Sequence, residues 1–461
     1  MLTVEKIGGS SMSRFQDVLN NIIKGNRTEN EMYNRIFVVS AYNNVTNWLL
    51  EDKKTKEPGI YSKFVEHSFY KTFIDKLLIK LLEINKTFEN IRLDQMEAKI
   101  FISNRIKQTI NYLDSMAEVL ATGYVDRNNI LLAVREILAS VGEAHSAFNS
   151  VNILLNNNIN ATFVDLCGFN DSEALTIDDR IKKSLKNIDF SDTITVVTGY
   201  AKGTEGIMRE FDRGYSEVTF SKIAVAVSAE EAIIHKEYHL SSADPMIVGK
   251  EYAVPVGKTN YDVADQLADI GMEAIHPKAS KPLEKAGINL RIKNTFEPFH
   301  EGTLISKTHF QTTPKVEVIA GTDKVVVVEI QDTSMVGETG FDYGIMQIFS
   351  KYNISYIVKS TAANSISIVI WESKLSNELI IDLRAKYEAI SVKYAALVCL
   401  IGSNMKMPSI IATAATTLAE NEINIDAISM SLKQVNIQFI IEREHYRNAI
   451  ILLNRKFFKV Q

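Results

Sequence analysis

The residues best suited to chemistry near the start of the chain are a lysine and two glycines, in the run Lys6-Ile7-Gly8-Gly9-Ser10-Ser11. The run lies where an expected strand, residues 3–7, passes into a helical pattern at residues 15–23. Glycines let backbone N–H groups approach a phosphate closely, and a nearby lysine can neutralise a phosphoryl group in transfer. The spacing is not that of a P-loop, and a Gly-Gly turn can also be purely structural.

A second glycine-rich stretch, Thr198–Gly206, follows an expected strand at residues 194–198 and precedes the run Asp212-Arg213-Gly214-Tyr215-Ser216-Glu217. Two such turns at strand ends could hold a polyphosphate between them. The guanidinium of Arg213 could bind a carboxylate through two hydrogen bonds, although a structural salt bridge is an equal alternative.

A third polar cluster, residues 236–245, follows the expected strand at residues 231–235. Ligands commonly bind in the loops at the carboxyl ends of strands in open α/β sheets. The histidines nearby have no spacing typical of zinc ligands, so the sequence predicts no metal site built from protein groups. Cys167 and Cys399 lie in expected apolar strands and are predicted to be unreactive core thiols.

These motifs need a scaffold, and the hydrophobic pattern predicts one in two parts. Up to about residue 305, strands alternate with helices, which is typical of an α/β domain with a largely parallel sheet. Residues 61–158 are mostly helical in pattern. The segment 216–228 is ambiguous, because its apolar residues nearly alternate as in a strand while its small residues also suit a helix.

After about residue 306 the order β-α-β-β-α occurs twice, and Asn353-Ile354-Ser355 resembles Asn424-Ile425-Asp426 at equivalent places. The repeat predicts two ferredoxin-like units side by side, with expected strands at residues 325–330, 354–359 and 365–370 in the first. A cleft between such units could hold a small regulatory ligand, or the pair could serve only dimerisation.

The composition limits the possible functions. The chain has 461 residues, with 51 Lys+Arg against 56 Asp+Glu and a formal charge of −5, so nothing indicates nucleic acid or an anionic membrane as a partner. Two cysteines cannot form a disulfide framework, which fits a reducing cytosol. The first residues do not resemble a signal peptide and no apolar run reaches the length of a membrane helix, so we expect a soluble, cytoplasmic protein.

Taken together and in this order, the motifs resemble those of the aspartokinases, in the amino-acid kinase superfamily, over nearly the whole chain. The matching segments are Lys6–Ser11, Val38–Ala41, Gly142-Glu143, Arg213–Glu217, Glu237, Asp244-Pro245, His276-Pro277 and Arg291–Thr295. The tail resembles the paired ACT domains of that family. Residues 213–217, 235–245 and 271–277 resemble the branch associated with ectoine gene clusters.

The resemblance implies a three-layer α/β/α amino-acid-kinase domain with a mostly parallel sheet over residues 1–305, with a helical insertion at about 60–130. Two ferredoxin-like (βαββαβ) ACT units follow at residues 315–395 and 396–461, with residues 315–320 pairing into the second. It also implies ATP-dependent phosphorylation of the side-chain carboxylate of L-aspartate, the first step of aspartate-family amino-acid or ectoine biosynthesis. Mg²⁺ is expected to bind through the nucleotide, and the ACT units to form a homodimer.

The resemblance assigns residues to each part of the site. Catalysis is assigned to Lys6, Gly8, Gly9 and Arg213. L-Aspartate is expected at Ser40, Glu143, Arg213, Ser216 and Glu217, with Arg213 on a carboxylate and Glu143 on the ammonium. ATP is expected at Lys6, Gly8, Gly9, Ser10, Lys236, Glu237, Ser242 and Asp244. An amino-acid effector is expected near Met335, Gly340, Phe341 and Ile357.

Several residues depart from the family's pattern. Lys236, Met246 and Glu273 replace the usual Thr, Arg and Lys on the nucleotide side, which leaves the adenine and ribose contacts open. Ile357 stands near where lysine-sensitive relatives tend to have an Asp, so we expect weak or absent inhibition by lysine. Two alternatives stay open: another amino-acid kinase, such as a glutamate 5-kinase, and a non-catalytic amino-acid sensor with ACT domains.

Overall fold

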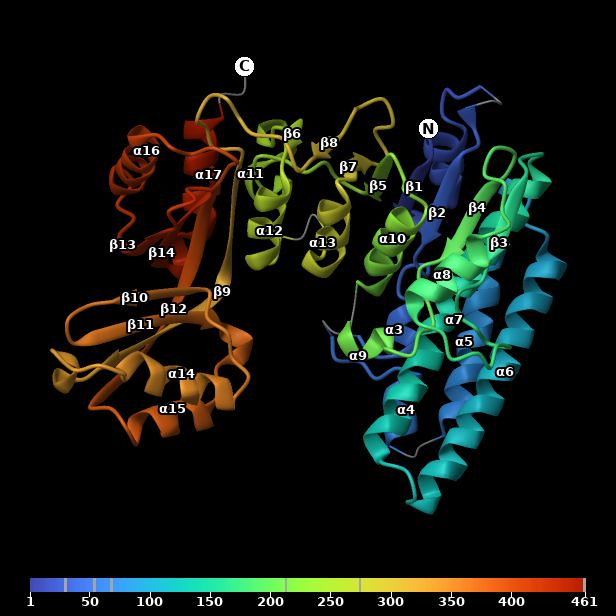
Figure 1. Cartoon of the computed structure of the whole chain (residues 1–461), viewed down its shortest axis with the longest axis horizontal. Helices are drawn as coiled ribbons and strands as arrows, with labels where there is room; N and C mark the ends of the chain where they lie inside the picture. The colour runs from blue at the N-terminus through green and yellow to red at the C-terminus, as the bar shows by residue number, and fades with distance from the viewer. Residues whose placement is uncertain (29–30, 53–54, 67–68, 212–213, 273–274, 459–461) are drawn as a thin grey trace. The chain divides into compact units, whose positions relative to one another are not determined.

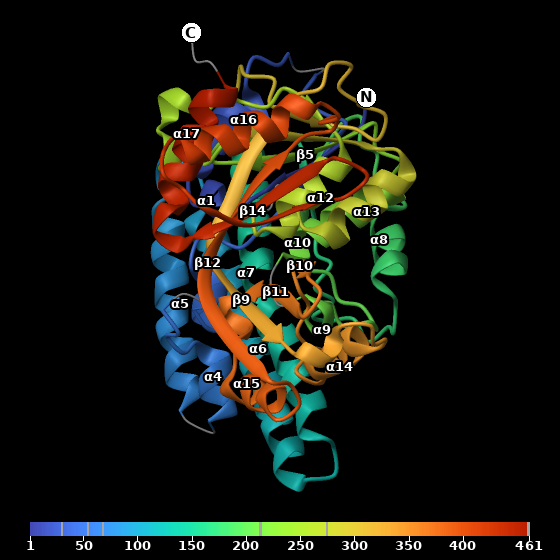
Figure 2. The same cartoon turned by 90° about the vertical axis from the view of Figure 1, so that its left-hand side faces the viewer.

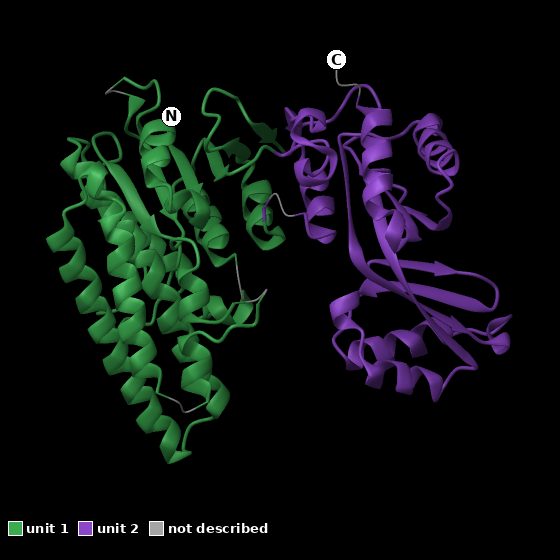
Figure 3. Cartoon of the chain, turned by 180° about the vertical axis from the view of Figure 1, so that it is seen from behind, with its two compact units in different colours: residues 1–239, 276–306 green, residues 240–275, 307–461 purple. Residues whose placement is uncertain are grey.

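The computed structural model describes residues 1–28, 31–52, 55–66, 69–211, 214–272 and 275–458. The chain forms two compact units, one of Met1–His239 with His276–Ser306 and one of Leu240–Ile275 with Lys307–Gln461 (Figure 3). This division differs from the expected boundary near residue 305. The reason is that Val248 and Leu267 pack into cores of the C-terminal unit.

The first unit contains a sheet whose strands are, in spatial order, β3 (Ala161–Val164), β4 (Ile194–Thr198), β2 (Arg35–Val39), β1 (Thr3–Ile7), β5 (Glu231–Lys236), β7 (Asn289–Asn294) and β8 (Thr303–Ile305). Neighbours from β3 to β7 pair in parallel, and β8 pairs antiparallel to β7. Every residue of β2 and β4 is buried, as expected of strands covered on both faces. The predicted, mostly parallel sheet is confirmed.

The helical elements of the first unit are α1 (Gly9–Met12), α2 (Phe15–Asp17), η1 (Val18–Lys24), α3 (Val45–Leu49), α4 (Ile60–Val65), α5 (Tyr70–Lys86), η3 (Glu89–Ile91), α6 (Gln95–Thr122), α7 (Arg127–Asn156), α8 (Ile177–Leu185), α9 (Ile207–Glu210), α10 (Tyr215–Ala226) and α13 (Pro277–Ala286). The carboxylates of Asp94 and Asp126 cap the first turns of α6 and α7. The helical pattern predicted for residues 61–158 is confirmed, and α5, α6 and α7 run side by side in a long bundle (Figure 1).

Helices cover both faces of this sheet, and two neighbouring residues of β1 show why. Glu5 and Lys6 point to opposite faces because successive side chains of a strand alternate. Lys6 meets Glu217 of α10 on one face. On the other, buried Arg35 donates to Glu5 at 2.6 Å and also to the carbonyl of Ile22 in η1 at 2.9 Å. The three-layer α/β/α arrangement follows from these contacts.

Most of the segment 216–228, whose pattern is ambiguous, belongs to helix α10, which ends at Ala226. Val218, Phe220 and Ile223 are all buried, because the helix packs against both the sheet and α13. A helix buried on several sides shows no 3.6-residue period, which explains the near-alternating pattern.

The elements of the second unit are α11 (Pro245–Val248), η4 (Lys250–Tyr252), β6 (Lys258–Thr259), α12 (Tyr261–Asp269), β9 (Val318–Gln331), η5 (Thr333–Met335), α14 (Phe341–Lys351), β10 (Val358–Thr361), β11 (Ser365–Trp371), η6 (Glu372–Lys374), α15 (Asn377–Arg384), β12 (Ala389–Ile401), α16 (Pro408–Ala419), β13 (Ile425–Met430), β14 (Asn436–Glu442), η7 (Arg443–His445) and α17 (Tyr446–Phe457). Its antiparallel sheet has the order β10-β11-β9-β12-β14-β13. The expected ferredoxin-like repeat is confirmed by this sheet and its two helix pairs. No helix among the described residues is both long and apolar enough to cross a membrane.

Two long strands, β9 and β12, run through the whole of this sheet (Figure 2). Val318–Thr322 pairs with the part of β12 that also pairs with β14, whereas Val325–Gln331 pairs with the other part and with β11. The strand predicted at residues 354–359 is wrong in position. Asn353 adopts a left-handed conformation (φ 53°), Ile354 turns into the core, and β10 begins only at residue 358.

Candidate active site

Lys6 lies near the carboxyl end of β1. Its Nζ lies 3.6 Å from Oε1 of Glu217, and the two side chains are only 13% and 12% exposed. Burial alone would raise the pKa of Glu217, but the charges of Lys6 and Lys236 hold that pKa below its ordinary value. The backbone N–H of His276, 2.7 Å from Oε2, acts in the same direction. Glu217 is therefore an anion that holds Lys6 at the strand end.

Glu143, in α7, is almost completely buried. Its Oε1 accepts a 2.6 Å hydrogen bond from the hydroxyl of Ser216 at the start of α10, and Ser40, just after β2, donates to that hydroxyl at 3.3 Å. Oε2 is buried and has no hydrogen-bond partner among the described residues. Burial raises the pKa of Glu143 to about 8, against the Ser216 bond and the charge of Lys6. Such a carboxyl suits an incoming ammonium group, which would favour its charged form.

Three glycines let the elements of the site come this close together. A Cβ on Gly142 of α7 would lie 2.7 Å from Cβ of Ala41, and one on Gly199 would lie 2.7 Å from Cβ of Ser216. A Cβ on Gly9 would lie 2.6 Å from the carbonyl oxygen of Ala41. Real side chains do not reach such spacings, so these positions require glycine.

Gly9→Ala is expected to lower the free energy of unfolding by about 1–3 kcal/mol, because the backbone of Ala41 must move away from the new methyl group. Gly8→Ala is the matched control, since its Cβ would meet no atom closer than 4.0 Å. Urea unfolding of the two variants measures the difference. Equal stabilities would show that the turn has room for a side chain at residue 9.

A cavity of about 250 Å³ lies among these elements and is lined by Gly9, Ser10, Ser40, Glu143 and Ser216, all predicted site residues. Sequence reasoning missed the other lining residues, which are Ala41, Tyr42, Asn43, Asn44, Thr46, Asn47, Gly214 and Tyr215. Six of them follow the β2 strand end directly, and strand-end position is the signal that could have found them. The arrangement can take a small molecule carrying an ammonium group.

On the nucleotide side, Lys236 ends β5, the parallel neighbour of β1, and its positive charge acts on Glu217. Glu237 follows it and is partly exposed. These two predicted residues belong to the same unit as Lys6. Arg213 and Glu273, for which roles or departures were predicted, lie outside the described residues.

Ser242 and Asp244 belong to the second unit and have structural partners there. The buried hydroxyl of Ser242 donates to Asn454 at 2.8 Å and accepts from the N–H of Val254 at 3.0 Å. Asp244 caps α11 by accepting from the N–H of Met246 at 2.8 Å. The hydroxyl proton of Ser242 and one of its two acceptor lone pairs are therefore already used, whereas the carboxylate of Asp244 keeps free lone pairs.

Three of the four predicted effector residues divide between two cores of the second unit. Met335 and Phe341 pack with the core around α14 and α15, and the Phe341 ring lies 6.1 Å from that of Tyr387. Gly340, which precedes α14, has a φ of 92° and open space around it. Ile357 packs against the other core. An effector near Gly340 would thus contact Phe341 more readily than Ile357.

Comparison with known proteins agrees with this fold. Residues 1–294 match the model of the Amino acid kinase family, and residues 398–457 match an ACT domain. The fold resembles an aspartate kinase of Clostridium acetobutylicum (TM-score 0.74, 22% identity, 99% of this chain and 100% of that one). It also resembles E. coli aspartokinase III in complex with aspartate and ADP (TM-score 0.67, 17% identity, all of both chains).

The chain belongs to the amino acid kinase family. Within it, the chain is 44% identical to the aspartate kinase Ask_Ect of Stutzerimonas stutzeri, over 99% of this chain and 97% of that one. It is 27% identical to the chloroplastic aspartokinase 1 of Arabidopsis thaliana, over 99% and 80%. The chain is thus an aspartate kinase with C-terminal ACT domains, which decides against the glutamate 5-kinase and sensor alternatives.

Proposed function

We propose that the active site described above transfers the γ-phosphoryl group of ATP to the side-chain carboxylate of L-aspartate. The observation that carries this proposal is the unpartnered Oε2 of buried Glu143, in a cavity that the Gly9-Ser10 turn also lines. The carboxylate suits the ammonium of an amino acid, and the turn beside Lys6 suits a phosphate. The aspartate and ADP of the E. coli relative support this pair of substrates.

In this proposal the acceptor carboxylate needs no general base, because it is already ionised at neutral pH. Lys6 stabilises the charge that develops on the transferred phosphoryl group, and Gly8, Gly9 and Ser10 donate hydrogen bonds to phosphate oxygens. Glu143 binds the substrate ammonium. The chain's contribution is positioning and charge stabilisation.

The remaining residues act around this centre. Ser216 and Ser40 orient the Glu143 carboxyl through their hydroxyls. Glu217 fixes Lys6. Arg213, which the resemblance places on a substrate carboxylate, completes the proposed aspartate site.

Lys236 and Glu237 are proposed to face the nucleotide. Mg²⁺ supplies neutralisation of the phosphate oxygens when it is bound with ATP. The carboxylates near Lys6 already have partners within the protein. The residues present therefore fit a Mg²⁺ ion that arrives with the nucleotide better than one held by protein carboxylates. Glu217 is held by Lys6, and Glu143 by Ser216.

A hydroxamate-trapping assay tests the proposal, because an acyl phosphate reacts with hydroxylamine to give a coloured iron complex. We expect product with L-aspartate and ATP and none with L-glutamate. Product with glutamate alone would make the chain a glutamate kinase. No product with either amino acid would contradict the proposed reaction.

The Michaelis constant for aspartate is expected to fall on the order of tenfold as the pH rises from 6.5 to 8, and then to level off. The reason is that the pKa of Glu143 is raised to about 8, so the free site is mostly protonated at lower pH, while only the charged carboxylate pairs with ammonium. Steady-state kinetics across this range measures the effect. A flat profile for aspartate would show that Glu143 is already ionised in the free enzyme.

We also propose that residues 315–395 and 396–461 act as two ACT units that dimerise. The edge strands β10 and β13 support this, because exposed edges need cover. The resemblance of residues 213–217 to the ectoine-associated branch supports a role in an aspartate-derived pathway. A reducing cytosol fits the two buried free cysteines.

Lysine is expected to inhibit this chain weakly or not at all. Ile357 offers no carboxylate to a lysine ammonium, and it packs against a core other than that of Met335 and Phe341. Kinase assays with lysine up to 10 mM measure this inhibition, because that concentration is about 10³ times higher than one at which a tightly bound effector would act. Strong inhibition at lysine concentrations below about 1 mM, where a weakly bound effector has little effect, would contradict the prediction.

A further inference from the structure

A second cavity, of about 670 Å³, lies in the first unit away from the proposed aspartate site. It is enclosed by α6, α7 and the turns that follow β3 and β4, and no described residue lines both cavities. Its walls are largely apolar, from Tyr112, Met116, Ile137 and Phe169. Volumes of about 300–1,000 Å³ with apolar walls and a few polar groups are typical of small-molecule sites.

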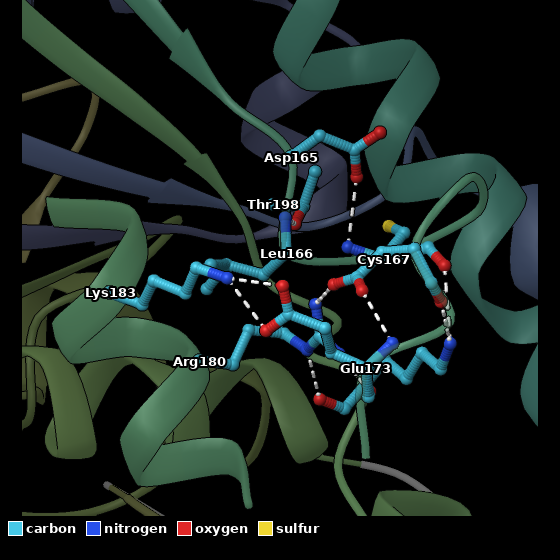
Figure 4. Close-up of polar contacts among 10 residues, drawn as sticks. Asp165, Leu166, Cys167, Glu173, Arg180, Lys183 and Thr198 are labelled. Atoms are coloured by element: carbon cyan, nitrogen blue, oxygen red, sulfur yellow. Dashed lines mark hydrogen bonds and ion pairs between the residues drawn. The ribbon is translucent and has the colours of Figure 1, made fainter. Parts of the chain in front are cut away.

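The wall formed by the turn after β3 is fixed from two sides. Arg180 of α8 donates to the carbonyl of Lys202 at 2.7 Å and pairs with Asp171. Figure 4 shows Arg180 near the turn that carries Leu166 and Cys167. Farther along the turn, the ring of Phe169 lies 4.3 Å from the guanidinium of Arg105. These contacts fix the wall through the protein's own side chains, so a ligand that binds there has little left to order.

Among the described residues, two acidic ones line this cavity. Asp171 is already paired with Arg180, so Glu136 of α7 is the carboxylate left for a ligand. Its Oε2 accepts a 2.6 Å hydrogen bond from the hydroxyl of Tyr200, and its Oε1 accepts one of 2.7 Å from the N–H of Met208. Burial raises the pKa of Glu136, against these hydrogen bonds. A carboxylate has about four lone-pair sites, so Glu136 can still accept from an ammonium, which would offset the cost of its burial.

Tyr200 stands between the two cavities. Its ring lies 6.1 Å from that of Tyr215, edge to face, and Tyr215 lines the aspartate cavity. Its backbone N–H also lowers the pKa of Glu143. The hydroxyl of Tyr200 is bound to Glu136. A ligand that binds Glu136 would therefore change how firmly Tyr200 is held, and the ring of Tyr200 contacts Tyr215 of the aspartate cavity.

We propose that this second cavity binds a small molecule with an apolar body and a protonated amine, and that binding changes the affinity for aspartate. The apolar body packs against Met116, Ile137 and Phe169, and the amine pairs with Glu136. Lys202 also lines the cavity, but its ammonium already donates to the carbonyl oxygens of Gly168 and Asp171 at 3.3 and 2.6 Å. The binding step does not depend on the proposed reaction, whereas its effect on aspartate does.

Two probes of nearly equal shape and opposite charge test the binding step on the full chain. We expect 2-phenylethylamine to bind at least about tenfold more tightly than 3-phenylpropionate by calorimetry, because only the amine pairs with Glu136. Glu136→Gln should remove that preference. Ala133→Trp and, from the facing helix, Met116→Trp should each abolish binding by filling the cavity. Equal binding of both probes, no binding, or binding that survives both tryptophans would overturn the site.

The effect on the aspartate site is tested separately. The Michaelis constant for aspartate should change at least about threefold with saturating 2-phenylethylamine in the unmodified enzyme, within the usual range of coupling between sites. It should not change in a tryptophan variant that no longer binds the probe. If 2-phenylethylamine binds but the Michaelis constant for aspartate does not change, the coupling between the two sites is overturned and the binding site itself is not. An enzyme without aspartate kinase activity would overturn the proposed function and not the binding result.

Discussion

Lys6→Ala should lower kcat by about 10³-fold while aspartate still binds. The ammonium of Lys6 is the positive charge at the Gly8-Gly9 turn, and it is positioned by Glu217 rather than by the aspartate cavity. Its loss therefore mainly removes stabilisation of the transferring phosphoryl group, and it acts on the amino acid only through the pKa of Glu143, which the charge of Lys6 lowers. Single-turnover kinetics measures the first effect, and calorimetry with aspartate the second.

Loss of Lys6 also leaves Glu217 buried without its partner, which can destabilise the fold. The double variant Lys6→Ala, Glu217→Gln removes the whole ion pair and separates the two effects. Lys222→Ala is a matched control on α10, since Lys222 pairs with Asp178 at 2.8 Å at the surface. It should keep normal turnover. A Lys6→Ala enzyme with near-normal kcat would remove Lys6 from the mechanism.

Glu143→Gln should raise the Michaelis constant for aspartate by roughly 10- to 100-fold, with little effect on that for ATP. Glutamine can keep the hydrogen bond from Ser216 but offers no charge to the substrate ammonium. In this variant the Michaelis constant for aspartate should also no longer depend on pH between 6.5 and 8, about the range over which the raised pKa of Glu143 acts. Initial-rate kinetics at several pH values measures both effects.

Glu97→Gln is the control for this variant. Glu97 lies on α6 and accepts a 2.7 Å hydrogen bond from Asn152 of α7, so it is a carboxylate bonded to the same helix but outside the cavity. Its replacement should leave both constants unchanged. A Glu143→Gln enzyme with an unchanged aspartate constant would assign the ammonium to another group.

Much of this site was predictable because its chemistry depends on short runs of sequence. The turn at Lys6–Ser11 shows its glycines and lysine directly, and Glu143 entered through a resemblance at Gly142-Glu143. The pairing of Glu143 with Ser216 was not predictable, because it joins residues 73 positions apart through the tight contacts of Gly199 and Gly142.

The prediction of secondary structure was least accurate in two places. One is a helix buried on several sides, and the other is a strand that follows a single left-handed turn. Helix α10 has no clear period because Val218, Phe220 and Ile223 are all buried. The expected strand at residues 354–359 begins late because Asn353 takes a left-handed turn and directs Ile354 inward. Neither effect is visible in a window of a few residues.

The shared strands β9 and β12 make the second unit mechanically continuous. Each of these strands belongs to both halves of the sheet. One half therefore cannot rotate relative to the other without bending the hydrogen-bonded β9–β12 pair. The ACT match at residues 398–457 excludes Val318–Thr322, the strand that completes that half of the sheet. Strain introduced beside α14 would therefore reach α16 and α17 along these strands, through the register shift between Ala395 and Leu397 where the two halves meet.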